Sequence, residues 1–82
     1  MNYEPGCPAR SLSGHDKGQY YVILACEGEY VLVSDGRRRP AARPKRKNKK
    51  HIQADHSPLS IGAPPTDERI QRELRDYIKR HK

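Results

Sequence analysis

Two short apolar runs joined by a glycine-containing link restrict the fold of this 82-residue chain more than any other feature. Residues 20–26 (YYVILAC) and 30–33 (YVLV) are rich in aromatic and β-branched residues, and both are too short for a stable helix. Such a pair predicts a β-hairpin. Because apolar residues stand at successive rather than alternate positions, we expect both faces to be buried, as in a small curled barrel.

The residues before the hairpin predict a turn and a short strand. Residues 1–9 contain two prolines and a glycine, so we expect an irregular lead-in. Residues 10–13 are expected to form a short first strand. Residues 14–18 (GHDKG) predict a tight turn, because glycine and aspartate tolerate the backbone angles that turns require. Asp16, and Asp35 after the second apolar run, are interpreted as turn-forming residues.

The C-terminal third predicts a linker followed by an amphipathic helix. Residues 54–65 hold three prolines and a glycine and are expected to link the two parts of the chain. The helix is expected over residues 66–82, with Thr66 as its N-cap. Its apolar stripe consists of Ile70, Leu74, Tyr77 and Ile78. The stripe either folds back on the barrel or docks into a protein partner or a second copy. Arginines on its other face would extend a nucleic-acid footprint.

Positive charge is concentrated in one block, residues 37–50 (RRRPAARPKRKNKK), which holds nine of the seventeen Lys and Arg and no acidic residue. A solvated tail or a nuclear-targeting signal would explain a basic run. This density beside a hairpin favours contact with a nucleic acid instead. Pro40 and Pro44 exclude a helix from the first half. Residues 45–53 are expected to add an edge strand with alternate charges facing water.

Other function classes have little support in the sequence. Cys7 and Cys26 form no CxxC pair, and the four histidines lack ligand spacing, so we expect no metal and no cofactor. No combination of residues predicts catalysis. Residues 20–26, the longest apolar run, are too short to cross a bilayer, and no signal peptide is apparent. We therefore expect a soluble, cytoplasmic protein with no membrane partner.

Three tyrosines of the hairpin have two alternative roles. Tyr20, Tyr21 and Tyr30 are able to stack on bases. A domain without Phe or Trp must also use Tyr in its core, so we expect most of them to be core residues and at most one to be a stacking platform. His15 and His51 are either plain turn or loop residues or hydrogen-bond donors to RNA.

The chain resembles the KOW motif of bacterial RNA-binding proteins related to large-subunit ribosomal proteins of archaea and eukaryotes. The resemblance runs over residues 11–53, through SLSGHDKG, YVIL, YVLVSDG and PKRKNKKHI. It implies an SH3-like β-barrel that binds RNA, often ribosomal RNA. In this resemblance Gly18 lets the turn approach RNA closely and Lys17 meets a phosphate. Pro8 and Ala9 stand where such proteins have an apolar first strand, so that strand is expected to be short.

Together these features predict a mainly β fold: a small SH3-like barrel of KOW type at residues 10–53, with a basic extension and a C-terminal amphipathic helix. We expect a non-catalytic, ribosome-associated protein of the translation machinery that binds structured RNA. An adaptor that docks through its helix is the alternative. The expected RNA-binding residues are Lys17, Gly18, Arg37, Arg38, Arg39, Arg43, Lys45, Arg46, Lys47, Lys49, Lys50 and His51.

Overall fold

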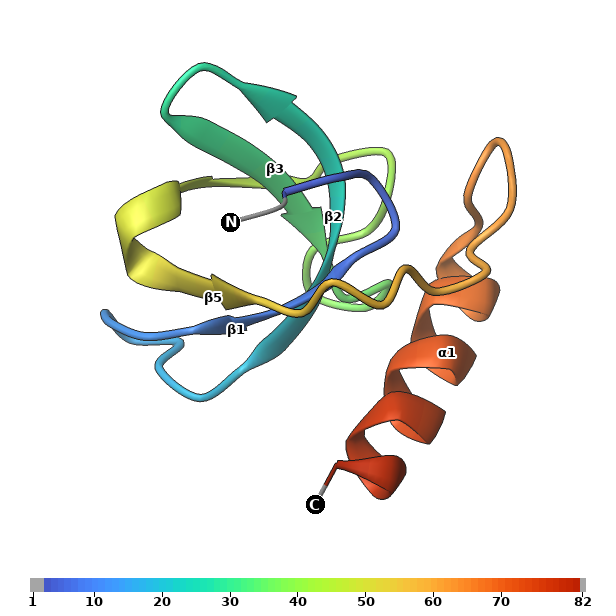
Figure 1. The fold of residues 1–82 in the computed structure, drawn as a ribbon. Coiled ribbons are helices and arrows are strands. Elements are labelled where there is room, and N and C mark those ends of the chain that lie inside the picture. The colour runs from blue at the N-terminus through green and yellow to red at the C-terminus, as the bar shows by residue number, and fades with distance from the viewer. Residues whose placement is uncertain (1–2, 82) are drawn as a thin grey trace.

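A computed structural model describes residues 3–81, which form one antiparallel sheet and one C-terminal helix (Figure 1). The five strands are ordered β4-β3-β2-β1-β5. The fold is therefore mainly β, as the sequence predicts. The elements are β1 (Pro8–Ser11), β2 (Tyr20–Glu27), β3 (Tyr30–Ser34), β4 (Lys45–Asn48), the short 3-10 helix η1 (Lys49–His51), β5 (Ile52–Ala54) and α1 (Asp67–Arg80).

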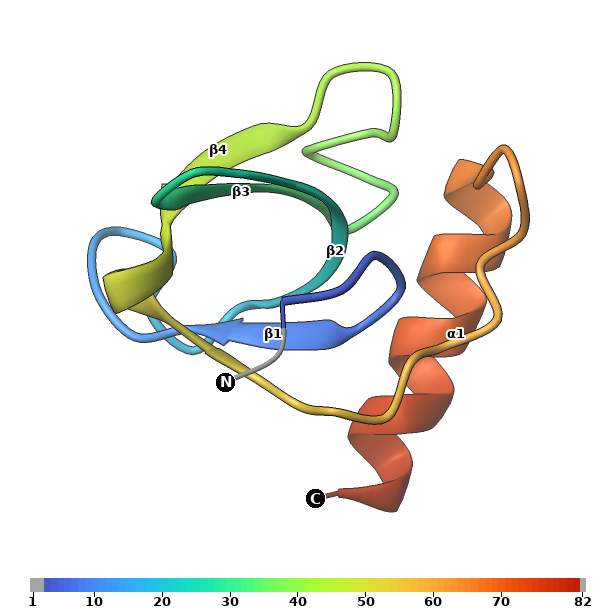
Figure 2. The same ribbon diagram turned by 45° about the horizontal axis from the view of Figure 1, so that its top comes forward.

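The hairpin expected from the two apolar runs is confirmed as β2 and β3. Its strands pair antiparallel from Val22 opposite Ser34 to Glu27 opposite Tyr30, and the register shifts between Ile23 and Ala25. An irregularity of this kind bends a strand and increases its twist. The sheet curls accordingly, so that η1 joins its two outer strands, β4 and β5, around a corner (Figure 2).

Both faces of the hairpin are buried, but by different partners. The concave face holds one core cluster, made of Cys7, Ala9, Tyr21, Ile23, Val31, Val33, Ile52 and Ala54. Val22 points the other way and packs with Ile61, Ile70 and Leu74, because α1 covers the outside of the sheet. The successive apolar residues of β2 thus reflect a curled sheet on one side and a helix on the other.

The helix folds back on the sheet, which was one of its two expected arrangements. Thr66 is the N-cap, and its Oγ1 accepts a hydrogen bond from the Arg69 backbone N–H (3.3 Å). Near the other end, the Tyr77 hydroxyl donates to Asp55 Oδ2 (2.6 Å). Burial and this hydrogen bond raise the pKa of Tyr77 to about 12.

Several expected boundaries differ from the structure. β1 begins at Pro8 rather than at residue 10, since Ile23 N–H donates to Cys7 O (2.9 Å) and Gly6 N–H donates to Ile23 O (2.7 Å), continuing the β1–β2 pairing toward the N-terminus. The lead-in at residues 1–9 is therefore partly strand and core. Residues 54–65 are also more than a linker: Ala54 ends β5, and Ile61 is buried under α1.

Ile70 tests whether the helix is integral to the fold. Ile70→Ala is expected to lower the free energy of unfolding by about 3 kcal/mol, because Ile70 is fully buried against Val22 and a cavity would remain. Ile78→Ala on the same helix is the matched control, since Ile78 is only half-buried. Urea denaturation of both variants measures the difference. Equal, small losses would show that the helix is accessory.

No helix within residues 3–81 combines the length and the apolar character needed to span a membrane.

Candidate nucleic-acid interface

The turn at residues 14–18 leaves open space beside Gly18, which is itself half-buried. Gly18 has φ +89°, and a Cβ built there would meet no heavy atom within 4 Å. Its N–H donates to Ser11 O (2.9 Å), which fixes the turn to the start of the sheet. Lys17 beside it is exposed. The turn thus presents an accessible backbone with a free cation next to it.

A valine at Gly18 tests two roles of this glycine, its backbone conformation in the turn and the close approach of RNA. Gly18→Val is expected to lower the melting temperature, because a β-branched residue at positive φ costs about 1–3 kcal/mol. Gly28→Val is the control: Gly28 lies in the β2–β3 turn with φ +60° and equally open space. If the Gly18 turn contacts RNA, only Gly18→Val weakens RNA binding as well. Equal RNA affinity of the two variants would exclude the turn from the interface.

The loop between β3 and β4 holds its backbone rigidly while its arginines face solvent. Asp35 Oδ1 accepts hydrogen bonds from the N–H groups of Arg37 (2.8 Å) and Arg39 (3.0 Å), which confirms its turn-forming role. Ser34 Oγ donates to Arg39 O (2.6 Å). Four exposed arginines project from this fixed loop: Arg37, Arg38, Arg39 and Arg43.

Lys47 is not at the surface, which contradicts its expected exposure. Its side chain is 8% exposed and lies inside the curl of the sheet. Lys47 Nζ donates to Asp16 Oδ1 (2.9 Å) and to Ser11 Oγ (2.9 Å). Lys45 points the same way and pairs with Asp16 Oδ2 (3.1 Å). Two lysines assigned to RNA contact are therefore partners of an internal carboxylate, because alternate residues of β4 face inward.

Asp16 is the centre of this internal network. Besides the two lysines, Asp16 Oδ1 accepts from Ser11 Oγ (2.8 Å) and Oδ2 from the Tyr21 hydroxyl (2.7 Å). Burial by itself raises the pKa of a carboxyl group, but these four hydrogen bonds outweigh it and hold the pKa of Asp16 well below its usual range. Asp16 is thus a structural anchor as well as a turn residue.

The outward residues of the β4–η1 segment stay at the surface. Arg46 is exposed, with its guanidinium carbon 3.9 Å from the centre of the Tyr30 ring. Lys49 is half-buried, and Lys50 and His51 are exposed. Of the three hairpin tyrosines, Tyr21 alone is fully in the core, whereas most of them were expected there. Tyr20 and Tyr30 are half-buried.

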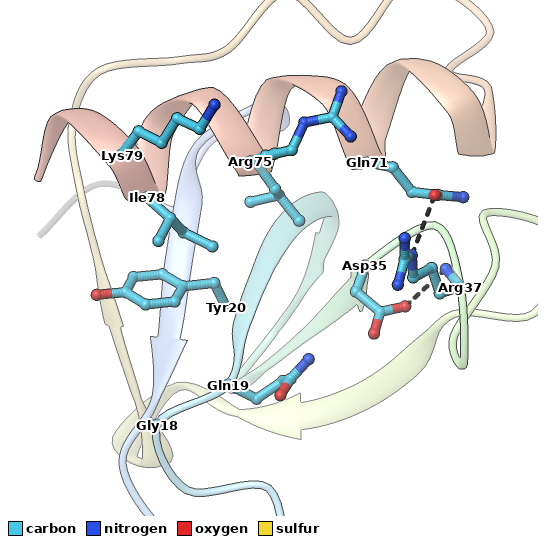
Figure 3. Close-up of a pocket in the computed structure, with 10 residues that line it drawn as sticks. Gly18, Gln19, Tyr20, Asp35, Arg37, Gln71, Arg75, Ile78 and Lys79 are labelled. Carbon is cyan, nitrogen blue, oxygen red and sulfur yellow. Dashed lines mark hydrogen bonds between the residues drawn. The ribbon is translucent and has the colours of Figure 1, made fainter. Parts of the chain in front are cut away.

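A groove of about 420 Å³ runs between the turn, the arginine loop and α1 (Figure 3). It brings two predicted residues, Gly18 and Arg37, to the same site. Arg75 and Lys79, one helical turn apart, join them from α1. The helix arginines were expected only to extend a footprint, and Lys79 was missed. The spacing of Arg75 and Lys79 was visible in the sequence, but their place across the groove from Gly18 depends on how the helix packs.

The remaining lining residues are apolar or neutral side chains and one carboxylate. Figure 3 shows Ile78 of α1 facing the ring of Tyr20, and Gln71 bonded to Arg37. Gln71 Oε1 accepts from Arg37 Nε (3.1 Å), and Gln71 Nε2 donates to Gly36 O (2.7 Å). These bonds tie the arginine loop to the helix and fix the width of the groove at this end.

Among residues 3–81, no three His, Cys, Asp or Glu side chains lie close enough together to hold a metal ion. Comparison of the chain with known proteins shows that no protein-family model matches it and that no curated protein matches it.

Proposed function

We propose that this chain is a non-catalytic RNA-binding protein of the translation machinery, built on an SH3-like barrel of KOW type. The strand order β4-β3-β2-β1-β5 in a strongly curled sheet supports the barrel assignment (Figure 2). The order of turn, apolar hairpin and basic continuation along the chain supports the KOW resemblance. The ligand we propose is structured RNA, with ribosomal RNA as the leading case.

One observation carries this proposal: a fixed loop displays four arginines with no acidic partner. Both ion pairs found within residues 3–81 end on the internal Asp16, so neither neutralises Arg37, Arg38, Arg39 or Arg43. Their backbone is held by Asp35 and Ser34. Asp35 is the one carboxylate of this loop, and it accepts from backbone N–H groups rather than from an arginine side chain. Four cations against one carboxylate leave a net positive charge, which a phosphate backbone neutralises while releasing its own counterions.

Recognition would depend mainly on charge and shape. Guanidinium groups fork onto phosphate oxygens, whereas few side chains here are placed to read the base edges of a duplex. Recognition of folded RNA by shape and backbone suits such a surface.

The adaptor alternative gains no supporting observation. Its docking element was the apolar stripe of α1, and Ile70, Leu74 and Tyr77 of that stripe are buried against the rest of this chain. A helix whose apolar side chains are already packed offers a partner only its charged face.

Sedimentation of cell extracts tests the proposal. At low salt the protein is expected to co-sediment with ribosomes or their large subunit. Rising salt should move it to the top of the gradient, because contacts between basic side chains and phosphate are displaced by counterions. Sequencing of RNA crosslinked to the protein in cells identifies the ligand. A protein found in the free fractions at every salt concentration, with no crosslinked RNA, would overturn the proposal.

A further inference from the structure

We propose that the groove between the Gly18 turn and α1 binds a single unstacked nucleotide of the RNA. The inference rests on the proposed RNA-binding function but is narrower. It assigns a single-stranded subsite, distinct from the duplex phosphates that the arginine loop is able to contact. Bulges, loops and ends of folded RNA supply such nucleotides.

The size and lining of the groove suit a small planar ligand. Its volume, about 420 Å³, is near the lower end of the range of pockets that enclose small molecules, so it accommodates one nucleotide rather than a length of helix. Tyr20, Leu74 and Ile78 make part of the wall apolar. Tyr77 packs against Tyr20 in a T-shaped arrangement with centroids 6.0 Å apart, and Ile78 covers part of the Tyr20 ring, so a base would stack on the part that stays open to the groove. An aromatic side chain fixed at the wall of a groove is the usual stacking partner of an unpaired base.

Positively charged side chains lie along one side of the groove. Arg75 and Lys79 line it along the helix, and both are exposed (Figure 3). Neither forms an ion pair with another described residue. A phosphate is therefore expected along this side, where two cations one helical turn apart meet it.

Asp35, Gln71 and Arg37 line the end of the groove away from Lys79, and Gln19 lies beside Gly18 (Figure 3). Asp35 Oδ1 accepts from two loop N–H groups, and no donor among residues 3–81 occupies Oδ2. A carboxylate repels phosphate and accepts a hydrogen bond from a donor on the base or ribose. Gln19 lines the groove with an amide group that both donates and accepts, whereas the Gln71 amide already bonds Arg37 and Gly36. The nucleotide would thus lie with its phosphate toward Arg75 and Lys79 and a donor group toward Asp35.

Titration of the ¹⁵N-labelled full chain with two RNAs tests the inference. One RNA is the single-stranded hexamer rA6 and the other is a blunt 12-base-pair duplex. We expect rA6 to shift the amide resonances of Gln19, Tyr20 and the 71–79 segment. The duplex should shift those of Arg38, Arg39 and Arg43 in the arginine loop and leave those of Gln19, Tyr20 and the 71–79 segment unchanged. A hexaglutamate peptide is the control for charge alone, and it should not reproduce the rA6 shifts.

Two double variants distinguish binding in the groove from a general effect of positive charge on the helix. Arg75→Gln with Lys79→Gln should weaken rA6 binding about tenfold, on the scale of the phosphate contacts of two cations. Arg72→Gln with Arg80→Gln removes the same charge from exposed positions that do not line the groove. Tyr20→Leu keeps an apolar side chain but removes the ring, and should weaken rA6 binding without changing duplex affinity.

The outcomes are distinguishable. Equal losses for the two double variants, rA6 binding without shifts in the groove, or the same shifts with hexaglutamate would overturn the nucleotide site and leave RNA binding intact. Absence of binding to both RNAs would overturn the proposed function itself, and the inference with it.

Discussion

Replacing Asp16 with alanine is expected to lower the free energy of unfolding by about 3–5 kcal/mol, the cost of removing one partner from a buried ion pair. Lys47, only 8% exposed, would keep its charge inside the sheet without a carboxylate. The Tyr21 and Ser11 hydroxyls would lose the oxygens to which they donate. Because a chain of this size is marginally stable, the variant should unfold at a much lower urea concentration than the wild type.

Urea denaturation followed by circular dichroism measures this loss. Asp76→Ala is the matched control, since Asp76 is an exposed aspartate on α1 and forms no ion pair with a described residue. A double variant, Asp16→Leu with Lys47→Met, should recover part of the stability, because it removes the unpaired charge together with its partner. An Asp16→Ala midpoint equal to that of the control would refute the anchoring role.

The pH dependence of stability gives a second measurement of the same network. The pKa of Asp16 is lowered by folding from its ordinary value of 3.8. Its contribution is therefore complete above that value and is lost only as the pH falls through the lower pKa of the folded state. The stability difference between wild type and Asp16→Ala should be constant above pH 5 and shrink in strong acid.

The hairpin and the helix could be predicted from the sequence, but the inward orientation of Lys45 and Lys47 could not. The runs at residues 20–26 and 30–33 and the stripe from Ile70 to Ile78 carry periodicities that depend only on near neighbours. Lys47 looks like any other cation of the basic block. Its burial depends on Asp16, which is 31 residues earlier and meets it only once the sheet has curled. Local patterns do not contain that contact.

The start of β1 was missed for a related reason. Pro8 and Ala9 are poor strand formers by composition. Pro8 lacks an N–H, but its carbonyl still accepts from Asp55 N–H (2.9 Å), and Ala9 pairs with both Tyr21 and Ala54. Pairing on two sides stabilises the strand despite its local propensity. The groove could not be predicted from the sequence either, because it forms only when α1 packs beside the turn.

Removing the charge of the arginine loop is expected to have the largest effect on binding. Arg37, Arg38, Arg39 and Arg43 changed together to Gln should flatten the logarithmic salt dependence of RNA affinity by about 3 units. This estimate takes four phosphate contacts at roughly 0.7–0.9 each, the range between single strands and a duplex. The fold should persist, because all four side chains are exposed and Asp35 holds the loop through backbone N–H groups. Arg37→Gln removes the exposed Arg37–Gln71 hydrogen bond, but the bond from Gln71 Nε2 to Gly36 O remains.

Fluorescence anisotropy with a labelled RNA at several salt concentrations measures the slope. Lys45 and Lys47 are left out of this variant because they neutralise Asp16, and their replacement would confuse binding with unfolding. The double variant Arg72→Gln with Arg80→Gln is the control, and each charge it removes should flatten the slope less than each loop arginine does. If the interface is the fixed loop, affinity at low salt falls most steeply for the loop variant while its melting temperature matches the wild type. An unchanged slope would mean that these arginines meet solvent alone and that the phosphate contacts lie elsewhere.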